Sequence, residues 1–241
     1  MIIYRIMNDT LWVIVITSLF CIILLVIVVG MYLQKTPIAY YPIIQLSSYG
    51  SGEIQPYNNG LARAIIQSSS LYPVPTGFTF LSNWSFNPLK IGGDIILDQN
   101  ETTATVSNSS GWGIIVGKKA LQGKVMYSVS MTYPGYQPDA NAIGIGSGLF
   151  SPFISYAHTI YIGSTTQGIA VYDTGSVSYN NSILFTGDSF AKQNGTNIVD
   201  IAVDTMAKLY WYRVDGGNWN SNSESHPATG SGGWSIKSIT N

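Results

Sequence analysis

The acidic residues are the first candidates for chemistry, because a glycoside hydrolase needs two carboxylates about 5 to 9 Å apart across the sugar. The chain contains three glutamates, Glu53, Glu101 and Glu224, and none stands two residues from another acid. Asp200 and Asp204 share one face of a strand-like run beside a turn. Acids in such places are more often solvated turn residues than cation ligands. We therefore predict that the protein is not an enzyme and assign no catalytic residue.

Groups that bind metals or act as nucleophiles are equally sparse. His158 and His226 lie in unrelated loop-like stretches, and Cys21 is the single cysteine. No nucleophile elbow, phosphate loop or zinc-ligand spacing occurs. We predict no metal site, no cofactor and no disulfide within the chain, and we interpret Cys21 as an apolar filler.

Aromatic residues remain as candidate binding groups. Tyr133, Tyr136 and Trp219 fall at strand ends or in loops, where rings can stack on a sugar or on a protein partner. Local packing is the competing interpretation of all three. Three other tryptophans fall inside strand-like runs, where burial is expected: Trp112, Trp211 and Trp234.

Composition limits the partners. Only 10% of the 241 residues are charged and the formal net charge is -1, so no basic field is present that would hold nucleic acid. Beyond residue 33, five asparagines stand in sequons for N-glycosylation, which would be used only on a lumenal or external face: Asn83, Asn100, Asn108, Asn180 and Asn194.

The element that positions the rest of the chain is the apolar segment 11–33, which contains no charged residue. About 20 apolar residues in a helix cross the roughly 30 Å core of a bilayer. Leu11 and Leu33 bound the segment, and the rings of Trp12 and Tyr32 stand near its two interfaces. We predict an uncleaved transmembrane helix over 11–33 behind a short head, 1–10. A cleaved signal peptide is the alternative, but its apolar core would be shorter.

Orientation in the membrane is weakly specified, since few charges flank the segment. We expect the amino terminus inside and the carboxyl-terminal domain outside the bilayer. Residues 34–75 contain five prolines among polar runs and are predicted to form a stalk. Within this stalk, Leu61 to Gln67 has the pattern of a short helix.

From residue 76 the hydrophobic period changes to two. A dozen short runs rich in β-branched and aromatic residues are separated by Gly, Asn, Ser or Pro clusters, which is typical of an all-β sandwich. In the clearest run, 124–133, Val125, Tyr127 and Val129 alternate with Met126 and Ser128. We expect one face of this strand in the core and the other face to be more polar.

The carboxyl-terminal half also resembles a known family. A strand ending at Asp204 leads through a turn into Leu209 and Trp211, then a Gly-Gly-Asn-Trp tip at 216–219 and the run HPATGSGGWSI at 226–236. This order is similar to the SPRY (B30.2-like) branch of the concanavalin A-like folds, in the versions seen in phage and large DNA virus proteins. The resemblance covers about residues 78–240 and implies an antiparallel, jelly-roll type β-sandwich over 76–241.

One departure from the family concerns its last two strands, which usually follow the position where this chain ends, at Asn241. The resemblance leaves two alternatives. Either the sandwich is trimmed, or the stalk or another chain fills those positions, since an uncovered edge invites pairing.

Two functions of different classes follow. In the first, the protein is a minor capsid or virion membrane protein, a viral structural component anchored in the lipid bilayer whose sandwich docks to shell proteins. In the second, it is a lectin-like or peptide-binding module that attaches a membrane to a glycan or a host protein. A cellular SPRY adaptor on an organelle membrane is a third interpretation. The fold alone does not choose among them.

Overall fold

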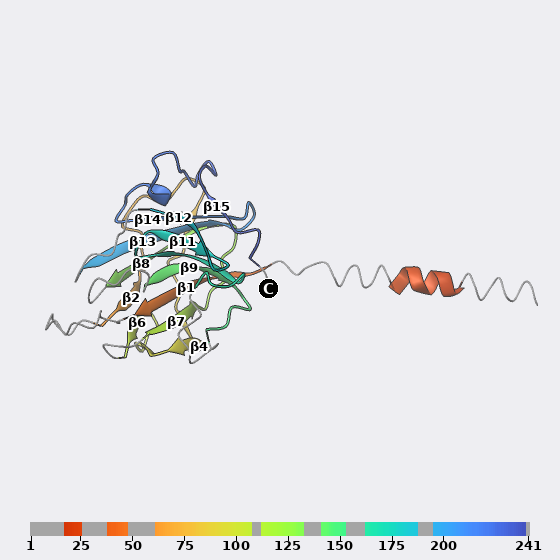
Figure 1. The fold of residues 1–241 in the computed structure, drawn as a ribbon, viewed down its shortest axis with the longest axis horizontal. Coiled ribbons are helices and arrows are strands. Elements are labelled where there is room, and N and C mark those ends of the chain that lie inside the picture. The colour runs from red at the N-terminus through yellow and green to blue at the C-terminus, as the bar shows by residue number, and fades with distance from the viewer. Residues whose placement is uncertain are drawn as a thin grey trace, which may run out of the picture. The chain divides into compact units, whose positions relative to one another are not determined.

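The computed structural model describes residues 17–25, 38–47, 61–107, 112–132, 141–152, 162–187 and 195–239. The chain divides into two compact units, Met1–Ile38 and Ala39–Asn241. In the first unit, residues 17–25 are helical (Figure 1). Within the described part of the chain, no helical segment combines the length and the apolar character needed to cross a bilayer. The ends of the predicted span lie outside the described residues: Leu11, Trp12, Tyr32 and Leu33.

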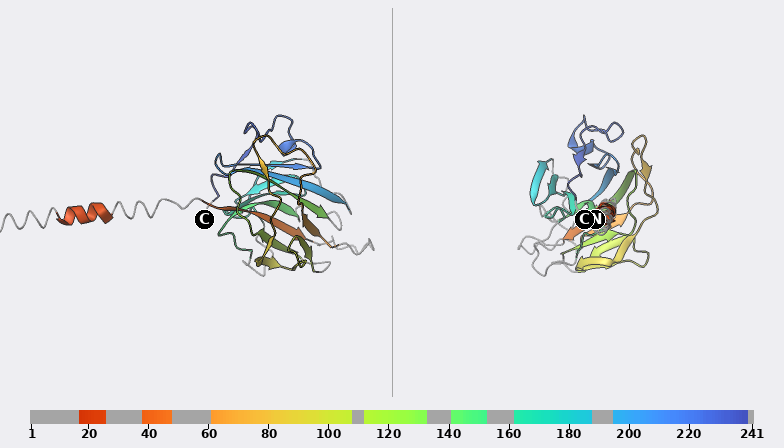
Figure 2. Two further views of the ribbon diagram at one scale, coloured as in Figure 1. Left: turned by 180° about the vertical axis from the view of Figure 1, so that it is seen from behind. Right: turned by 90° about the vertical axis from the view of Figure 1, so that its right-hand side faces the viewer.

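The second unit contains two mainly antiparallel sheets (Figures 1 and 2). In spatial order, the first sheet consists of β12 (Ser182–Thr186), β11 (Ser176–Tyr179), β10 (Gly168–Tyr172), β9 (Ala142–Ser147), β1 (Tyr40–Ser47), β7 (Trp112–Gly117) and β4 (Phe86–Gly93). The second consists of β15 (Trp234–Ser235), β14 (Leu209–Val214), β13 (Thr196–Asp204), β8 (Lys124–Thr132), β2 (Arg63–Ile66), β6 (Thr103–Val106) and β5 (Ile95–Leu97). A short strand, β3 (Thr79–Phe80), runs parallel to β8, and a 3-10 turn, η1, covers Trp219–Ser221.

The two sheets pack face to face, which confirms the predicted all-β sandwich. Tyr127 on β8 donates a hydrogen bond from its hydroxyl to the Gly144 carbonyl on β9 at 2.6 Å. Tyr210 on β14 reaches the Ile143 carbonyl in the same way at 3.3 Å. Both tyrosine side chains are fully buried, so each hydroxyl finds its partner on the opposite sheet.

The outer face of the second sheet is covered, contrary to the expectation of a more polar face on β8. Met126 and Ser128 are 0% exposed. Met126 belongs to a cluster with three other buried residues, Ala202, Trp211 and Trp219, and the partly buried side chains packed on it include Val74, Phe78 and Phe80. The segment before β3 and the loop after β14 therefore form a further layer over this sheet.

The predicted stalk is corrected for its described residues, because β1 and β2 belong to the two sheets. β1 lies between β9 and β7, and β2 lies between β8 and β6. Pro42 is accommodated in β1 because the ladder with β7 begins only at Ile43, opposite Val116. The stretch predicted as a short helix is strand β2, whose Ala64 and Ile66 are buried.

Candidate functional site

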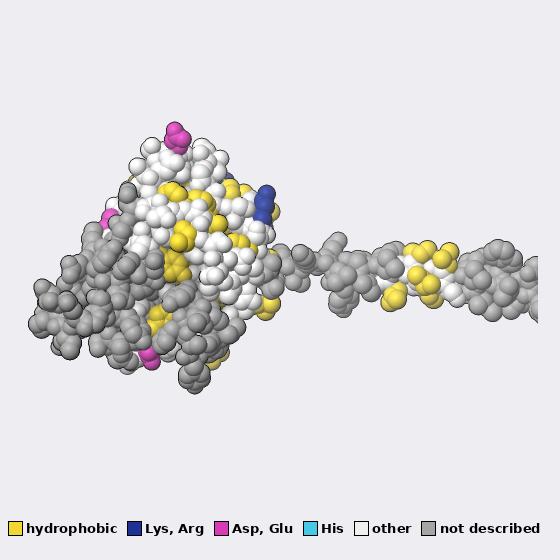
Figure 3. Space-filling model, in the orientation of Figure 1, with side chains coloured by type: hydrophobic (Ala, Val, Ile, Leu, Met, Phe, Trp, Pro, Cys, Tyr) yellow, Lys and Arg dark blue, Asp and Glu magenta, His cyan; other side chains and the backbone are white. Residues whose placement is uncertain are grey.

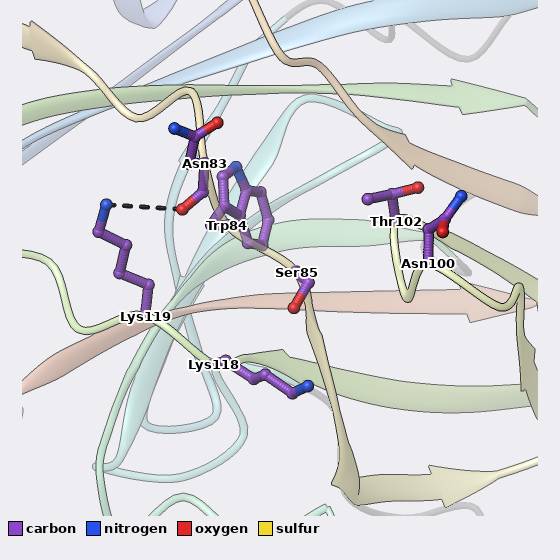
Figure 4. Close-up of a pocket in the computed structure, with 7 residues that line it drawn as sticks. All are labelled: Asn83, Trp84, Ser85, Asn100, Thr102, Lys118 and Lys119. Carbon is purple, nitrogen blue, oxygen red and sulfur yellow. Dashed lines mark hydrogen bonds between the residues drawn. The ribbon is translucent and has the colours of Figure 1, made fainter.

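Three loops from separate strands meet at one end of the sandwich and form an open hollow with a volume of about 510 Å³ (Figure 4). One loop precedes β4, the second joins β5 to β6, and the third follows β7. Seven residues line the hollow: Asn83, Trp84, Ser85, Asn100, Thr102, Lys118 and Lys119. Since β4 and β5 are edge strands of their sheets, the hollow lies at the lateral rim of this end.

Backbone pairing brings these loops together. The Phe86 amide donates to the Glu101 carbonyl at 2.7 Å, and the Lys118 amide donates to the Ser85 carbonyl at 2.8 Å. The β5–β6 turn is fixed by Asp98, whose carboxylate accepts the amides of Thr102 at 2.8 Å and Thr103 at 3.0 Å. The backbone hydrogen bond from Thr103 is the largest of the effects that lower the pKa of Asp98.

The two lysines of the hollow differ in their partners. Lys118 forms an ion pair with Glu101, which also accepts the Ser85 hydroxyl at 3.4 Å. Lys119 contacts a carbonyl, that of Asn83, at 3.5 Å. A carbonyl carries no net charge to neutralise an ammonium group. Lys119 therefore contributes most of the positive potential in the hollow.

Trp84 lines the hollow with little of its ring exposed, because the side chain is only 6% accessible. Its ring makes edge contacts with Phe86 at 5.7 Å and Tyr127 at 5.4 Å between centroids. The indole Nε1 is buried and has no hydrogen-bond partner within the described part of the chain. A covered ring of this kind offers no face on which a sugar could stack.

The polar groups of the hollow are side-chain amides and hydroxyls, which both donate and accept hydrogen bonds, and two ammonium groups, which only donate. Figure 4 shows Lys119 at one end of the hollow and Asn100 with Thr102 at the other. Such an arrangement suits an acceptor-rich ligand, above all a carboxylate. The described residues contain no group of three or more His, Cys, Asp or Glu side chains that would hold a metal ion.

The aromatic candidates from the sequence do not form this site. Trp219 is 8% exposed and packs on the Arg213 guanidinium, whose carbon lies 4.5 Å from the ring centroid. The ring of Trp219 therefore packs within the protein and is not available to stack on a ligand. Tyr133 and Tyr136 lie outside the described residues. Trp211 is buried as predicted, whereas Trp112 and Trp234 are partly buried.

Asp200 and Asp204 are not solvated, which corrects the prediction for both. Asp200 is 0% exposed and accepts the Nε–H of Arg213 at 2.7 Å and the hydroxyl of Ser128. Burial raises the pKa of Asp200, and the hydrogen bonds from Ser128 and Arg213 act in the opposite direction. Asp204 is 6% exposed and accepts the amides of Met206 and Ala207, the two middle residues of the β13–β14 turn.

Three of the five sequon asparagines are described, and all three are exposed: Asn83, Asn100 and Asn180. Asn83 and Asn100 line the hollow, so glycans on them would fill it. Asn108 and Asn194 lie outside the described residues, as does His158. His226 is exposed and pairs through its backbone with Ser231.

Sequence reasoning did not find the lysines and hydroxyls of the hollow. The only local signals are the adjacent pair Lys118 and Lys119 and the two sequons, which carry no information about proximity. No family model matches this chain, and no curated protein matches its sequence. The chemistry of the hollow is therefore the basis on which its role is inferred.

Proposed function

We propose that this protein is a non-catalytic, membrane-anchored docking protein, a structural component of a virus particle whose sandwich binds a protein of the shell. The anchoring part of the proposal rests on the apolar segment 11–33, of which residues 17–25 are helical. The viral part rests on the resemblance of residues 78–240 to SPRY-like modules of phage and large DNA viruses. A jelly-roll sandwich of that family is the finer form of the all-β sandwich described above.

The observation that carries the docking role is the polar hollow with two lysines at the rim of the sandwich. Its groups belong to loops held by β4, β6 and β7, so the backbone of the hollow is fixed before a partner arrives. Lys119 supplies a positive charge that its carbonyl contact does not neutralise. The ligand that fits is an acidic loop or tail of a partner protein, with a carboxylate beside Lys119 and further acceptors toward Asn100 and Thr102.

Charge reversal in the hollow tests this role. The full chain in lipid nanodiscs is titrated with a peptide of eight glutamates and, separately, with the matching peptide of glutamines. Loss of one charged hydrogen bond is worth about 1.5 to 3 kcal/mol, so Lys119→Glu should weaken glutamate-peptide binding at least tenfold. Arg63→Glu makes the same change of charge at an exposed position on β2 and should leave binding unaltered. Equal effects of the two substitutions would refute a docking role for the hollow.

An attachment module that binds a host peptide would use the same hollow and remains the second candidate. The covered ring of Trp84 and the buried ring of Trp219 give no support to its lectin-like form. The two candidates differ in where the domain is displayed. Labelling of Lys119 by a membrane-impermeant amine reagent on intact particles would favour attachment, whereas labelling only after the shell is opened would favour docking inside the particle.

A further inference from the structure

The end of the sandwich at which β1 begins has a distinct chemical character. Tyr40 pairs with Ser147 and bridges Leu121, and the Gly148 amide donates to the Ala39 carbonyl at 3.0 Å. The β13–β14 turn reaches the same end, because Lys208 places its ammonium group 4.8 Å from the centroid of the Tyr40 ring. We call this surface the β1 end. It is where the chain that follows residue 38 enters the sandwich.

All the lysines in the described part of the chain lie at the β1 end. Lys90 donates to the Gly148 carbonyl at 2.7 Å, and the Ile236 amide donates to the Lys208 carbonyl at 2.9 Å, which places the next residue, Lys237, here too. The other lysines directly follow β7 or begin β8. The six are Lys90, Lys118, Lys119, Lys124, Lys208 and Lys237.

Carboxylates compensate these lysines only in part. Glu101 pairs with Lys118, Asp204 lies 3.7 Å from Lys124, and Asp98 holds the β5–β6 turn. Six lysines and three carboxylates leave a net charge of +3 on the described residues of this end. The opposite end has the opposite balance, since three acids and one arginine stand where strands meet there: Asp94, Asp173, Asp215 and Arg63.

Exposed apolar side chains stand among the lysines. Leu89 is 81% exposed, Leu149 is 61% exposed and Met206 is 83% exposed. Leu89 precedes Lys90, Leu149 follows the glycine that Lys90 contacts, and Met206 is two residues before Lys208. On the face in Figure 3, dark blue Lys and Arg atoms lie at the side where β1 begins, and magenta acidic groups lie elsewhere. Cationic groups mixed with apolar tips are the surface chemistry of proteins that lie on lipid headgroups.

We propose that the β1 end binds the anionic headgroups of a phospholipid bilayer, with Lys90, Lys208 and Lys237 on the phosphates and the tips of Leu149 and Met206 in the headgroup layer. The proposal rests on the proposed anchoring of segment 11–33. Contact with the membrane orients the sandwich, so that the hollow at its rim faces neighbouring proteins on the same surface.

The length of the connecting chain supports contact with the membrane. Five residues, 34–38, separate the predicted span from Ala39, and they reach at most about 17 Å when fully extended. The Debye length at physiological ionic strength is about 8 Å. Salt therefore screens the lysines from the bilayer charge when the connection is fully extended, but not when the domain lies closer to the bilayer. Because the tether keeps the bilayer at a high effective concentration, a patch too weak to bind lipid from solution can hold the domain in place.

The test uses the full chain in nanodiscs, with Cys21→Ala and a single nitroxide at Leu149→Cys or, as a control at the opposite end, at Ser107→Cys. Electron paramagnetic resonance measures the collision rates of each label with a water-soluble nickel complex and with oxygen. When phosphatidylserine is added to phosphatidylcholine, the label at position 149 should lose contact with nickel and gain contact with oxygen. The label at position 107 should not change. Lys90→Glu, Lys208→Glu and Lys237→Glu combined should abolish the shift, whereas Arg63→Glu should preserve it.

The outcomes separate this inference from the proposed function. A chain that leaves the nanodisc without detergent overturns the anchoring and this inference together. A chain that stays in the nanodisc while the label at position 149 is indifferent to phosphatidylserine overturns this inference alone. Binding of the glutamate peptide by the Lys119→Glu variant is measured separately and decides only the role of the hollow.

Discussion

Replacing Arg213 by methionine should be among the most destabilising single changes in the sandwich. Arg213 is 6% exposed, and its Nε donates to the carboxylate of Asp200, which is fully buried. Its second nitrogen, Nη2, donates to the Pro73 carbonyl at 2.8 Å, and Trp219 packs on the guanidinium. Methionine keeps the volume of the stem and removes both hydrogen bonds. The Asp200 charge is then left without its cation in a dry environment.

The expected loss is about 3 to 5 kcal/mol of unfolding free energy at neutral pH, the usual cost of leaving a buried charge unpaired. The loss should shrink as the pH falls. Without Arg213, the pKa of Asp200 rises further above the unfolded value of about 3.9, so the folded variant keeps a proton that the unfolded chain has released. Stability of the variant therefore rises as pH falls toward the unfolded pKa, by up to about 1.4 kcal/mol per pH unit.

The assay is urea unfolding of the full chain in detergent micelles, followed by tryptophan fluorescence between neutral and mildly acidic pH. Lys118→Met is the control, because its partner Glu101 is partly exposed and the pair should contribute less than about 1 kcal/mol. Combining Arg213→Met with Asp200→Leu removes both charges and should recover most of the stability. A loss below 1 kcal/mol, or one that grows at lower pH, would contradict the assignment of a buried ion pair.

Three further outcomes can be measured. A fragment over residues 39–241 should unfold cooperatively and give a β-rich circular dichroism spectrum. A fragment over 73–241 lacks β1 and β2 and should not fold, so a stable 73–241 fragment would contradict the central position of β1 in its sheet. Leu24→Arg should cost about 2.5 to 3.5 kcal/mol of membrane insertion, and release of the wild-type chain by alkaline carbonate would rule out the anchor. Gly144→Ala should lower the unfolding free energy by about 1 to 3 kcal/mol, because a Cβ there would lie 2.0 Å from the Ile169 carbonyl oxygen. An unchanged urea midpoint would refute this close approach of β9 and β10.

Alternation of apolar residues predicted most of the strands because it reports directly on which residues face a core. The pairing across the Asp204 to Lys208 turn was recognised in this way, and β13 and β14 pair as expected, with Asp204 opposite Leu209. Alternation could not show that both faces of β8 are buried. That burial depends on segments about fifty residues upstream and ninety downstream, which cover the outer face by tertiary packing.

The predictions of a stalk over 40–47 and of a short helix at 63–66 are wrong because local signals there conflict with tertiary pairing. Prolines usually interrupt strands, yet Pro42 occupies a position where β1 has no ladder to β7. The short run 63–66 is too brief for its period to distinguish helix from strand. Its conformation is decided by the neighbours β6 and β8, which occur later in the chain.

The hollow could not have been predicted, because each of its three loops is unremarkable alone. Their meeting requires β4 to pair with β7, β5 to pair with β6, and the two edges to lie side by side. The charge asymmetry of the sandwich has the same origin. A net charge of -1 for the whole chain suggests weak electrostatics, but the fold places the six described lysines at one end of the sandwich.

The central position of β1 determines how the sandwich responds to mechanical load. In the proposed role, a force between the membrane anchor and a docked partner enters the sandwich through Ala39, directly before β1. Five residues of β1 are paired with β7 and six with β9, so β1 leaves the sheet only if both ladders break. An edge strand is held by a single ladder. In the proposed role, the tether is thus attached to a strand held on both sides, which suits a protein that links a membrane to a rigid shell.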